Sequence, residues 1–194
     1  MSPASGNLKK NETTIQQSLD GFSYALVPAA VYQDDDKDKY LDFLGLNDET
    51  SNVRADYIES ADAYLVYHTK AEDKDFRHPL GILLEKLIKE NLERTETTRI
   101  YLNINDNNYD MIVLKGASLL FVNNFHFKTK EDFLYFLLFA IEQLHLDAGS
   151  VPVYFLGMIE EQSAIVEITS RYMRDIRFMG KDYNALNISK SCES

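Results

Sequence analysis

The chain has 194 residues, of which 45% are hydrophobic, and this is enough to build the core of one domain or of two small ones. Its 31 acidic residues outnumber its 20 Lys and Arg residues, and the net charge of −11 argues against binding to the phosphate backbone of nucleic acids. The single cysteine, Cys192, excludes an internal disulfide and a zinc site made of several cysteines.

Residues 1–13 are small and polar, and we predict a disordered tail there. No apolar segment follows the early lysines, which argues against a secretory signal. The longest apolar run, Phe133–Ile141, is about half of the ~20 residues needed to cross a bilayer. A lone cysteine fits a reducing compartment, so we expect a cytoplasmic protein without membrane insertion.

Residues 14–97 are predicted to form a shortened N-terminal α/β unit. Asp20-Gly21 is a strong hairpin signal between two strands. The aspartates between Asp34 and Asp38 lack the glycine and distal glutamate of a calcium loop, so we interpret them as a solvated helix start. The predicted elements are strands at 15–19 and 22–27, a helix through 40–44, an irregular loop at 45–60, a strand at 63–67 and a helix at 79–92.

Residues 98–180 are predicted to form a second unit with three strands, a helix, a strand, a helix and a strand. The first three strands have links so short that they must pair antiparallel. Strands joined through a helix return parallel, so the order βββαβαβ predicts an α/β fold with a mixed five-stranded sheet, the ribonuclease H-like unit that actin-like ATPases use twice. The predicted strands lie at 100–105, 109–114, 118–125, 151–156 and 175–178, and residues 181–194 are a polar tail.

Both helices of the second unit carry signals for their first turn. Thr129 is a predicted N-cap, and Asp132 lies three residues on, where it can reach back as in a capping box. The second helix is expected to start near Glu160 and Glu161, because negative charge is favourable at a helix N-terminus.

Three places match, in part, the nucleotide contacts of actin-like ATPases. In that fold the first hairpin of each unit has an acidic, glycine-containing turn whose backbone amides approach the phosphates. Asp20-Gly21 and Asp106 occupy the two equivalent turns, although the second turn has no glycine. Gly157 keeps one of the two glycines that follow a late strand. Asp20, Gly21, Asp106 and Gly157 are therefore the candidate residues of an Mg-ATP site.

A ribonuclease H-type nuclease would need several carboxylates that hold two metal ions. Asp106, Asp110 and Asp132 are the candidates, but each is more simply interpreted as a turn former, a strand-edge residue or a helix cap. The histidines show no metal spacing, and no serine has the glycines of a nucleophile elbow. We therefore assign no catalytic residue and no metal ligand.

Five short segments follow one another along the chain: Leu19–Ser23, Leu26–Pro28, His78–Leu80, Phe121–Phe125 and Thr129–Tyr135. In this order they resemble an uncharacterised bacterial family known as a domain of unknown function, DUF3822. Over about residues 14–180 the resemblance implies an actin-like ATPase fold, but it implies no substrate, cofactor or catalytic residue. Tyr24-Ala25 joins two of the segments directly, where such families have further strands, which indicates a shortened N-terminal unit.

Together these observations favour a non-catalytic module or scaffold that binds an unidentified protein and needs no cofactor. The acidic segment Asp34–Asp38 and the hairpin tip at Asn107-Asn108 are candidate contacts. The alternative is a nucleotide-binding protein of the actin-like ATPase class that takes Mg-ATP. The oligomeric state stays open.

Overall fold

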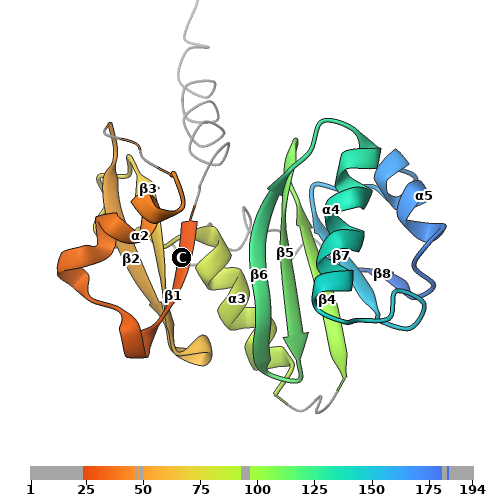
Figure 1. Ribbon diagram of the computed structural model, residues 1–194, viewed down its shortest axis with the longest axis horizontal. Helices are drawn as coiled ribbons and strands as arrows, with labels where there is room; N and C mark the ends of the chain where they lie inside the picture. The colour runs from red at the N-terminus through yellow and green to blue at the C-terminus, as the bar shows by residue number, and fades with distance from the viewer. Residues whose placement is uncertain (1–23, 47, 49, 93–96, 181–182, 184–194) are drawn as a thin grey trace, which may run out of the picture. The chain divides into compact units, whose positions relative to one another are not determined.

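The computed structural model describes residues 24–46, 48, 50–92, 97–180 and 183 (Figure 1). The predicted strand at 15–19, the turn Asp20-Gly21 and Cys192 lie outside the described residues. The chain divides into two compact units, one up to His78 and one from Pro79 onward. The helix that follows Pro79, which the sequence analysis placed in the N-terminal unit, is thus part of the second unit.

The first unit is a three-stranded antiparallel sheet in the order β1-β3-β2. Leu41 of helix α2 is fully buried and packs with Ala25, Val27 and Val66 of the sheet. The elements are β1 (Tyr24–Pro28), α2 (Lys37–Phe43), β2 (Asn52–Ile58), β3 (Ala63–Thr69) and 3-10 turns at Ala29–Val31, Asp34–Asp36 and Glu59–Ala61.

The prediction of an irregular loop at residues 45–60 is wrong. Strand β2 lies within that range and pairs with β3 over its whole length. Asn52–Tyr57 alternates polar with apolar residues, a period of two that is typical of a half-buried strand, and the prediction overlooked this signal. The strand forms because β3, which is richer in apolar residues, provides a complete antiparallel partner.

The second unit contains the five-stranded mixed sheet that the sequence predicts. Its strand order is β6-β5-β4-β7-β8, with antiparallel pairs from β6 to β4 and parallel pairs from β4 to β8. Figure 1 shows α4 and α5 together on one side of this sheet. The elements are α3 (Pro79–Glu90), β4 (Thr98–Ile104), β5 (Asn108–Lys115), β6 (Ser118–His126), α4 (Lys130–Gln143), β7 (Val153–Gly157), α5 (Ala164–Ser170) and β8 (Ile176–Phe178).

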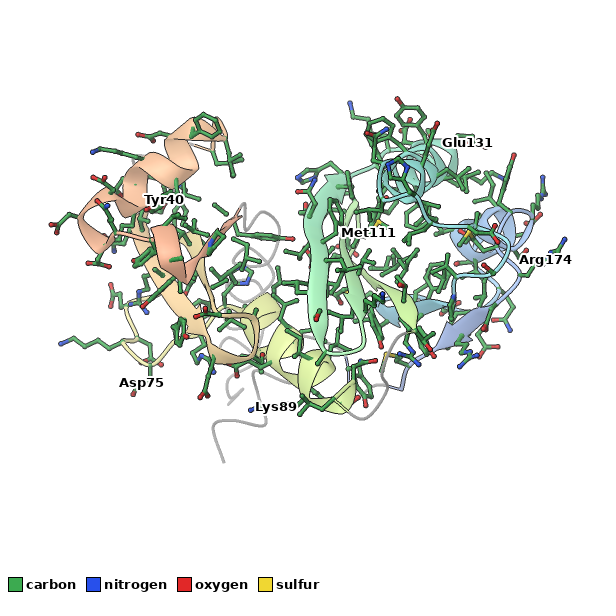
Figure 2. All side chains as sticks on the ribbon, turned by 60° about the horizontal axis from the view of Figure 1, so that its bottom comes forward. Tyr40, Asp75, Lys89, Met111, Glu131 and Arg174 are labelled. Atoms are coloured by element: carbon green, nitrogen blue, oxygen red, sulfur yellow. The ribbon has the colours of Figure 1, made fainter. Side chains whose placement is uncertain are left out.

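The main core lies between the sheet and α4. Met111, labelled in Figure 2, is fully buried there, as are Leu102, Phe133 and Phe155. Strand β7 is covered on both faces, as predicted, because all residues from Val153 to Leu156 are buried. On the face of the sheet away from α4, a hydrogen bond of 2.8 Å joins the Asn91 side chain, just after α3, to the Tyr101 hydroxyl.

The capping box of α4 is confirmed. The Asp132 amide donates to the Thr129 hydroxyl, and the Asp132 carboxylate accepts from the Thr129 amide at 3.0 Å. Helix α5 begins later than Glu160 and Glu161 suggested. Ser163 is its N-cap and accepts a hydrogen bond from the Val166 amide. A side-chain cap satisfies a free amide directly, whereas a glutamate acts on the helix dipole only through weaker electrostatics.

Candidate functional site

Two of the four predicted nucleotide-binding residues lie at the same end of the five-stranded sheet. Strands β4 and β7 run parallel, and Ile104 is the register partner of Gly157. Asp106 lies in the turn directly after β4, and the Met158 amide donates to the Ile104 carbonyl at 2.8 Å. Asp106 thus follows the carboxyl end of β4, and Gly157 is the last residue of the neighbouring parallel strand β7; open α/β sheets bind ligands at such ends.

The turn between β4 and β5 is built from asparagines rather than glycines. The Asn105 amide donates to the Asn108 carbonyl at 2.9 Å, and the Asn105 side chain donates to the Asn108 side chain at 3.2 Å. Asp106 and Asn107 are exposed at the tip, whereas Asn108 is buried. The prediction that Asn107-Asn108 forms a contact surface is therefore wrong for Asn108, whose side chain is hydrogen-bonded within the turn.

Gly157 has a structural reason to be glycine. Its φ of +88° is unfavourable for residues with a side chain, and a Cβ atom there would overlap the Ile104 carbonyl oxygen. The same Cβ atom would lie 2.9 Å from Oδ1 of Asn103. Close packing between β4 and β7 thus requires glycine at this position, with or without a nucleotide.

A buried polar network crosses three strands near this turn. Asn103, Asp110 and Asn124 are neighbours in the register of β4, β5 and β6. The Asp110 carboxylate accepts from the Asn103 amide group at 2.9 Å and from the Asn124 amide group at 2.8 Å. Asp110 is only 6% exposed and Asn103 only 3%. These amide donors compensate the cost of burying a carboxylate, so the network fixes the strand register.

Two of the three candidate carboxylates of the nuclease hypothesis have structural roles. Asp132 caps α4, and hydrogen bonds from the Lys128 and Thr129 amides and the Thr129 hydroxyl lower its pKa. Asp110 is held in the network by Asn103 and Asn124. Within the described ranges, no group of three or more His, Cys, Asp or Glu side chains is placed to hold a metal ion.

The first unit has a partly buried polar cluster that the sequence analysis missed. The Asp56 carboxylate accepts from the His78 amide at 2.7 Å and from the Tyr67 hydroxyl at 3.2 Å. Burial raises the pKa of Asp56 and lowers the pKa of His78 to about 3, which keeps this imidazole neutral. The cluster ties the segment at His78 to the sheet; a lone Asp in a polar strand was too weak a signal to predict it.

The acidic segment at Asp34–Asp38 is partly neutralised by its own lysines. Lys37 contacts Asp34 at 3.5 Å, and Lys39 contacts Asp36 at 2.6 Å. The predicted solvated start of α2 is confirmed, since these residues form a 3-10 turn that leads into the helix. Tyr40, labelled in Figure 2, lies on this helix, and its hydroxyl donates to the Val31 carbonyl at 3.0 Å.

Helix α4 carries an exposed aromatic pair that the sequence analysis did not single out. Tyr135 is 63% exposed and Phe139 is 47% exposed, and their rings stack with centroids 6.2 Å apart. Phe136 contacts Tyr135 on one side and stacks on Phe125 on the other, at 5.4 Å in each case. The pair was detectable from the i, i+4 spacing, but the apolar pattern of α4 extends around so much of the helix that its exposed side was not evident.

None of the helices in the described part of the chain combines the length and the apolar composition needed to span a bilayer.

A search among curated proteins finds no match.

Two solved structures resemble this chain over nearly its whole length. One is a crystal structure from Bacteroides thetaiotaomicron of a protein with an actin-like ATPase fold and unknown function. Its TM-score is 0.78 at 12% identity, over 98% of this chain and 84% of the other. The other is a chain of the PilM-PilN type IV pilus biogenesis complex, with a TM-score of 0.44 and 10% identity over 97% and 74% of the two chains, a likeness too low to carry an argument.

The first of these likenesses confirms the predicted mixed α/β fold of the actin-like ATPase type. At this level of identity it shows the fold alone. The model of a family described as "Protein of unknown function (DUF3822)" matches residues 7–176, and the chain therefore belongs to this family.

Proposed function

We propose that this protein is a non-catalytic binding module or scaffold that contacts another protein through the exposed face of α4. The observation that carries the proposal is the stacked pair Tyr135 and Phe139, which leaves two aromatic rings in solvent. Aromatic side chains are enriched at protein interfaces, where they supply contact area at a low cost in conformational entropy. The role fits a bacterial cytoplasmic protein, as the sequence leads us to expect.

The pair is held in place by a series of ring contacts that reaches the core. Phe125 lies 5.4 Å from Tyr109, which is fully buried, and the same Phe125 stacks on Phe136. Phe136 in turn contacts Tyr135. A surface anchor that is already ordered loses little freedom on binding, so more of its contact energy contributes to affinity.

Affinity capture from a native lysate tests this proposal. We expect the full chain to retain a specific protein, and the double variant Tyr135→Ala, Phe139→Ala to retain at least about tenfold less of it, since interface hot spots contribute about 2 kcal/mol or more. Phe43→Ala is the matched control, because Phe43 is 91% exposed but belongs to the other unit. An identical set of captured proteins for wild type and double variant would refute the role of α4.

A second candidate function is the binding of Mg-ATP. Its support is the shared position of Asp106 and Gly157 at the carboxyl ends of β4 and β7. In this proposal Asp20 and Gly21 supply the other phosphate turn, and magnesium is shared between the phosphates and carboxylates such as that of Asp106. The asparagine-rich turn lacks the glycine that would let phosphate oxygens approach freely.

Thermal melting with and without millimolar Mg-ATP tests the second candidate. A ligand present far above its dissociation constant raises the melting temperature by several degrees, because it binds only the folded state. The shift should shrink in Asp106→Asn and persist in Asp35→Asn, an exposed aspartate of the other unit. Absence of any shift in the wild type would rule out a useful nucleotide site.

A further inference from the structure

Strand β6 is one of the two edge strands of the five-stranded sheet, and β8 is the other (Figure 1). β5 pairs with one edge of β6, and among the described residues no strand pairs with its other edge. The strand has nine residues, Ser118–His126, and none of them is proline, aspartate, glutamate, lysine or arginine. Short length, proline and charge are the usual means by which proteins protect a sheet edge from pairing, and β6 has none of these.

The free edge of β6 presents a definite set of backbone groups. The Phe127 amide donates to the Asn107 carbonyl at 2.9 Å, next to the register pair Asn108 and His126. Residues of an antiparallel strand face its neighbour alternately, so Phe125, like Phe127, exchanges bonds with β5. The N–H and C=O groups of Val122, Asn124 and His126 therefore point away from β5.

The regular part of the edge is long enough for a short ladder. The pairing of β5 with β6 shifts between Val113 and Leu114, which leaves Leu120 as the extra residue of a bulge. From Phe121 to His126 the register is continuous. A bulge can protect an edge by twisting it, but this one lies at the start of β6 and leaves the following six residues regular.

We propose that β6 pairs antiparallel with β6 of a second copy of this chain, so that the two five-stranded sheets join into one. A two-fold axis at Asn124 places Val122 of each copy opposite His126 of the other. All three outward-facing residues then meet outward-facing residues, which is the condition for an antiparallel ladder. Strand addition of this kind needs only backbone groups and uncharged side chains, both of which β6 supplies.

Charge favours a second copy at this edge over approach at most other surfaces. Each chain has a net charge of −11, so two copies repel each other over most orientations. β6 contains no acidic residue, and the pairing brings uncharged strands together. Added salt screens the remaining repulsion, so the dimer should become stronger as the salt concentration rises, unlike a complex held by attraction between opposite charges.

Sedimentation equilibrium of the full chain tests the inference at about 20 mM and about 300 mM NaCl, where the screening lengths differ severalfold. We expect a monomer–dimer equilibrium that shifts toward dimer at the higher salt. Asn123→Lys adds a charge at an exposed position of β6 and should weaken the dimer by at least about tenfold, because lysine at an edge opposes pairing. Asn123→Thr, which keeps the strand neutral, should preserve it.

Two further variants keep the test decisive. Val122→Pro removes one outward amide and should also abolish the dimer, while Gln143→Lys adds a charge at the exposed end of α4 and should leave it intact. Circular dichroism and melting verify that each variant is folded. A wild-type monomer at about 100 µM, a dimer insensitive to both Asn123→Lys and Val122→Pro, or a dimer that weakens with salt would overturn the inference. The result does not depend on the proposed role of α4, whose variants change other residues.

Discussion

The two faces of the five-stranded sheet are buried in different ways. The face toward α4 is covered by aliphatic and aromatic side chains such as Leu102, Met111 and Phe133. The opposite face carries Asp110 between Asn103 and Asn124, close to the end where β4 and β7 stop. The first face is stabilised by buried apolar area, whereas the second combines apolar residues such as Ile112, which is also fully buried, with a few hydrogen bonds of defined geometry. Removing an apolar contact from the first face should therefore lower the free energy of unfolding in proportion to the apolar area lost. Removing one partner of the network on the second face should instead leave a buried polar group without a hydrogen bond.

The largest effect is expected on the apolar face. Phe133 is fully buried, with ring centroids 4.5 Å from Tyr109 and 5.5 Å from Phe127. Phe133→Ala should lower the free energy of unfolding by about 3–5 kcal/mol, since it removes apolar contacts and leaves a cavity. Phe139→Ala, on the exposed side of the same helix, should change it by no more than about 0.5 kcal/mol. Urea unfolding measures both, and equal losses would contradict the assignment of the two faces of α4.

A smaller loss is expected where the two parallel strands end. Gly157→Ala should cost about 1–3 kcal/mol from backbone strain alone, and the overlap with the Ile104 carbonyl adds to it. Gly45→Ala separates the two causes, because Gly45 also has a positive φ, +69°, but has open space around its Cβ position. Urea unfolding should show the greater loss for Gly157→Ala. If the two variants lost equal stability, close packing of β7 against β4 would not be the reason for the glycine.

The polar network on the second face should respond to a substitution that barely alters the shape of the side chain. Asp110→Asn replaces an acceptor with an amide donor between two groups, on Asn103 and Asn124, that donate to it. One buried donor then lacks an acceptor, which costs about 1–3 kcal/mol. Asp106→Asn, at the exposed turn, should be close to neutral. The same unfolding measurement distinguishes them, and a neutral Asp110→Asn would show that the network does not need the carboxylate.

The pattern of the second unit was readable because local signals agreed with the tertiary structure. Alternating residues predicted β4, β-branched and aromatic residues predicted β5, and Thr129 with Asp132 predicted the start of α4. The cross-strand contact between Asn103, Asp110 and Asn124 could in principle have been predicted, because a hairpin around Asn105–Asn108 aligns the first two. It was missed because each residue was interpreted by itself rather than in register.

Other features depend on contacts that no local pattern contains. Gly157 requires glycine only because β7 ends beside Ile104, and this register follows from the parallel pairing of distant segments. The exposure of Tyr135 and Phe139 depends on which side of α4 faces the sheet. The framework was thus predictable, and the surface that distinguishes the candidate functions was not.

The smallest expected effect is a pH dependence of stability at the start of α4, the helix that covers the apolar face of the sheet. Hydrogen bonds from Lys128 and Thr129 lower the pKa of Asp132 in the folded state. A lowered folded-state pKa contributes stability that is present above the unfolded value of about 3.9 and is lost as the pH falls through the folded value. Asp132→Asn should therefore melt at a lower temperature than the wild type at pH 7, and the gap should narrow as the pH falls below about 4.

Glu131→Gln, an exposed neighbour outside the capping box, serves as the control for general loss of charge. A gap that stays constant between pH 7 and pH 3 would mean that the cap works through geometry alone, without a contribution from the ionised carboxylate.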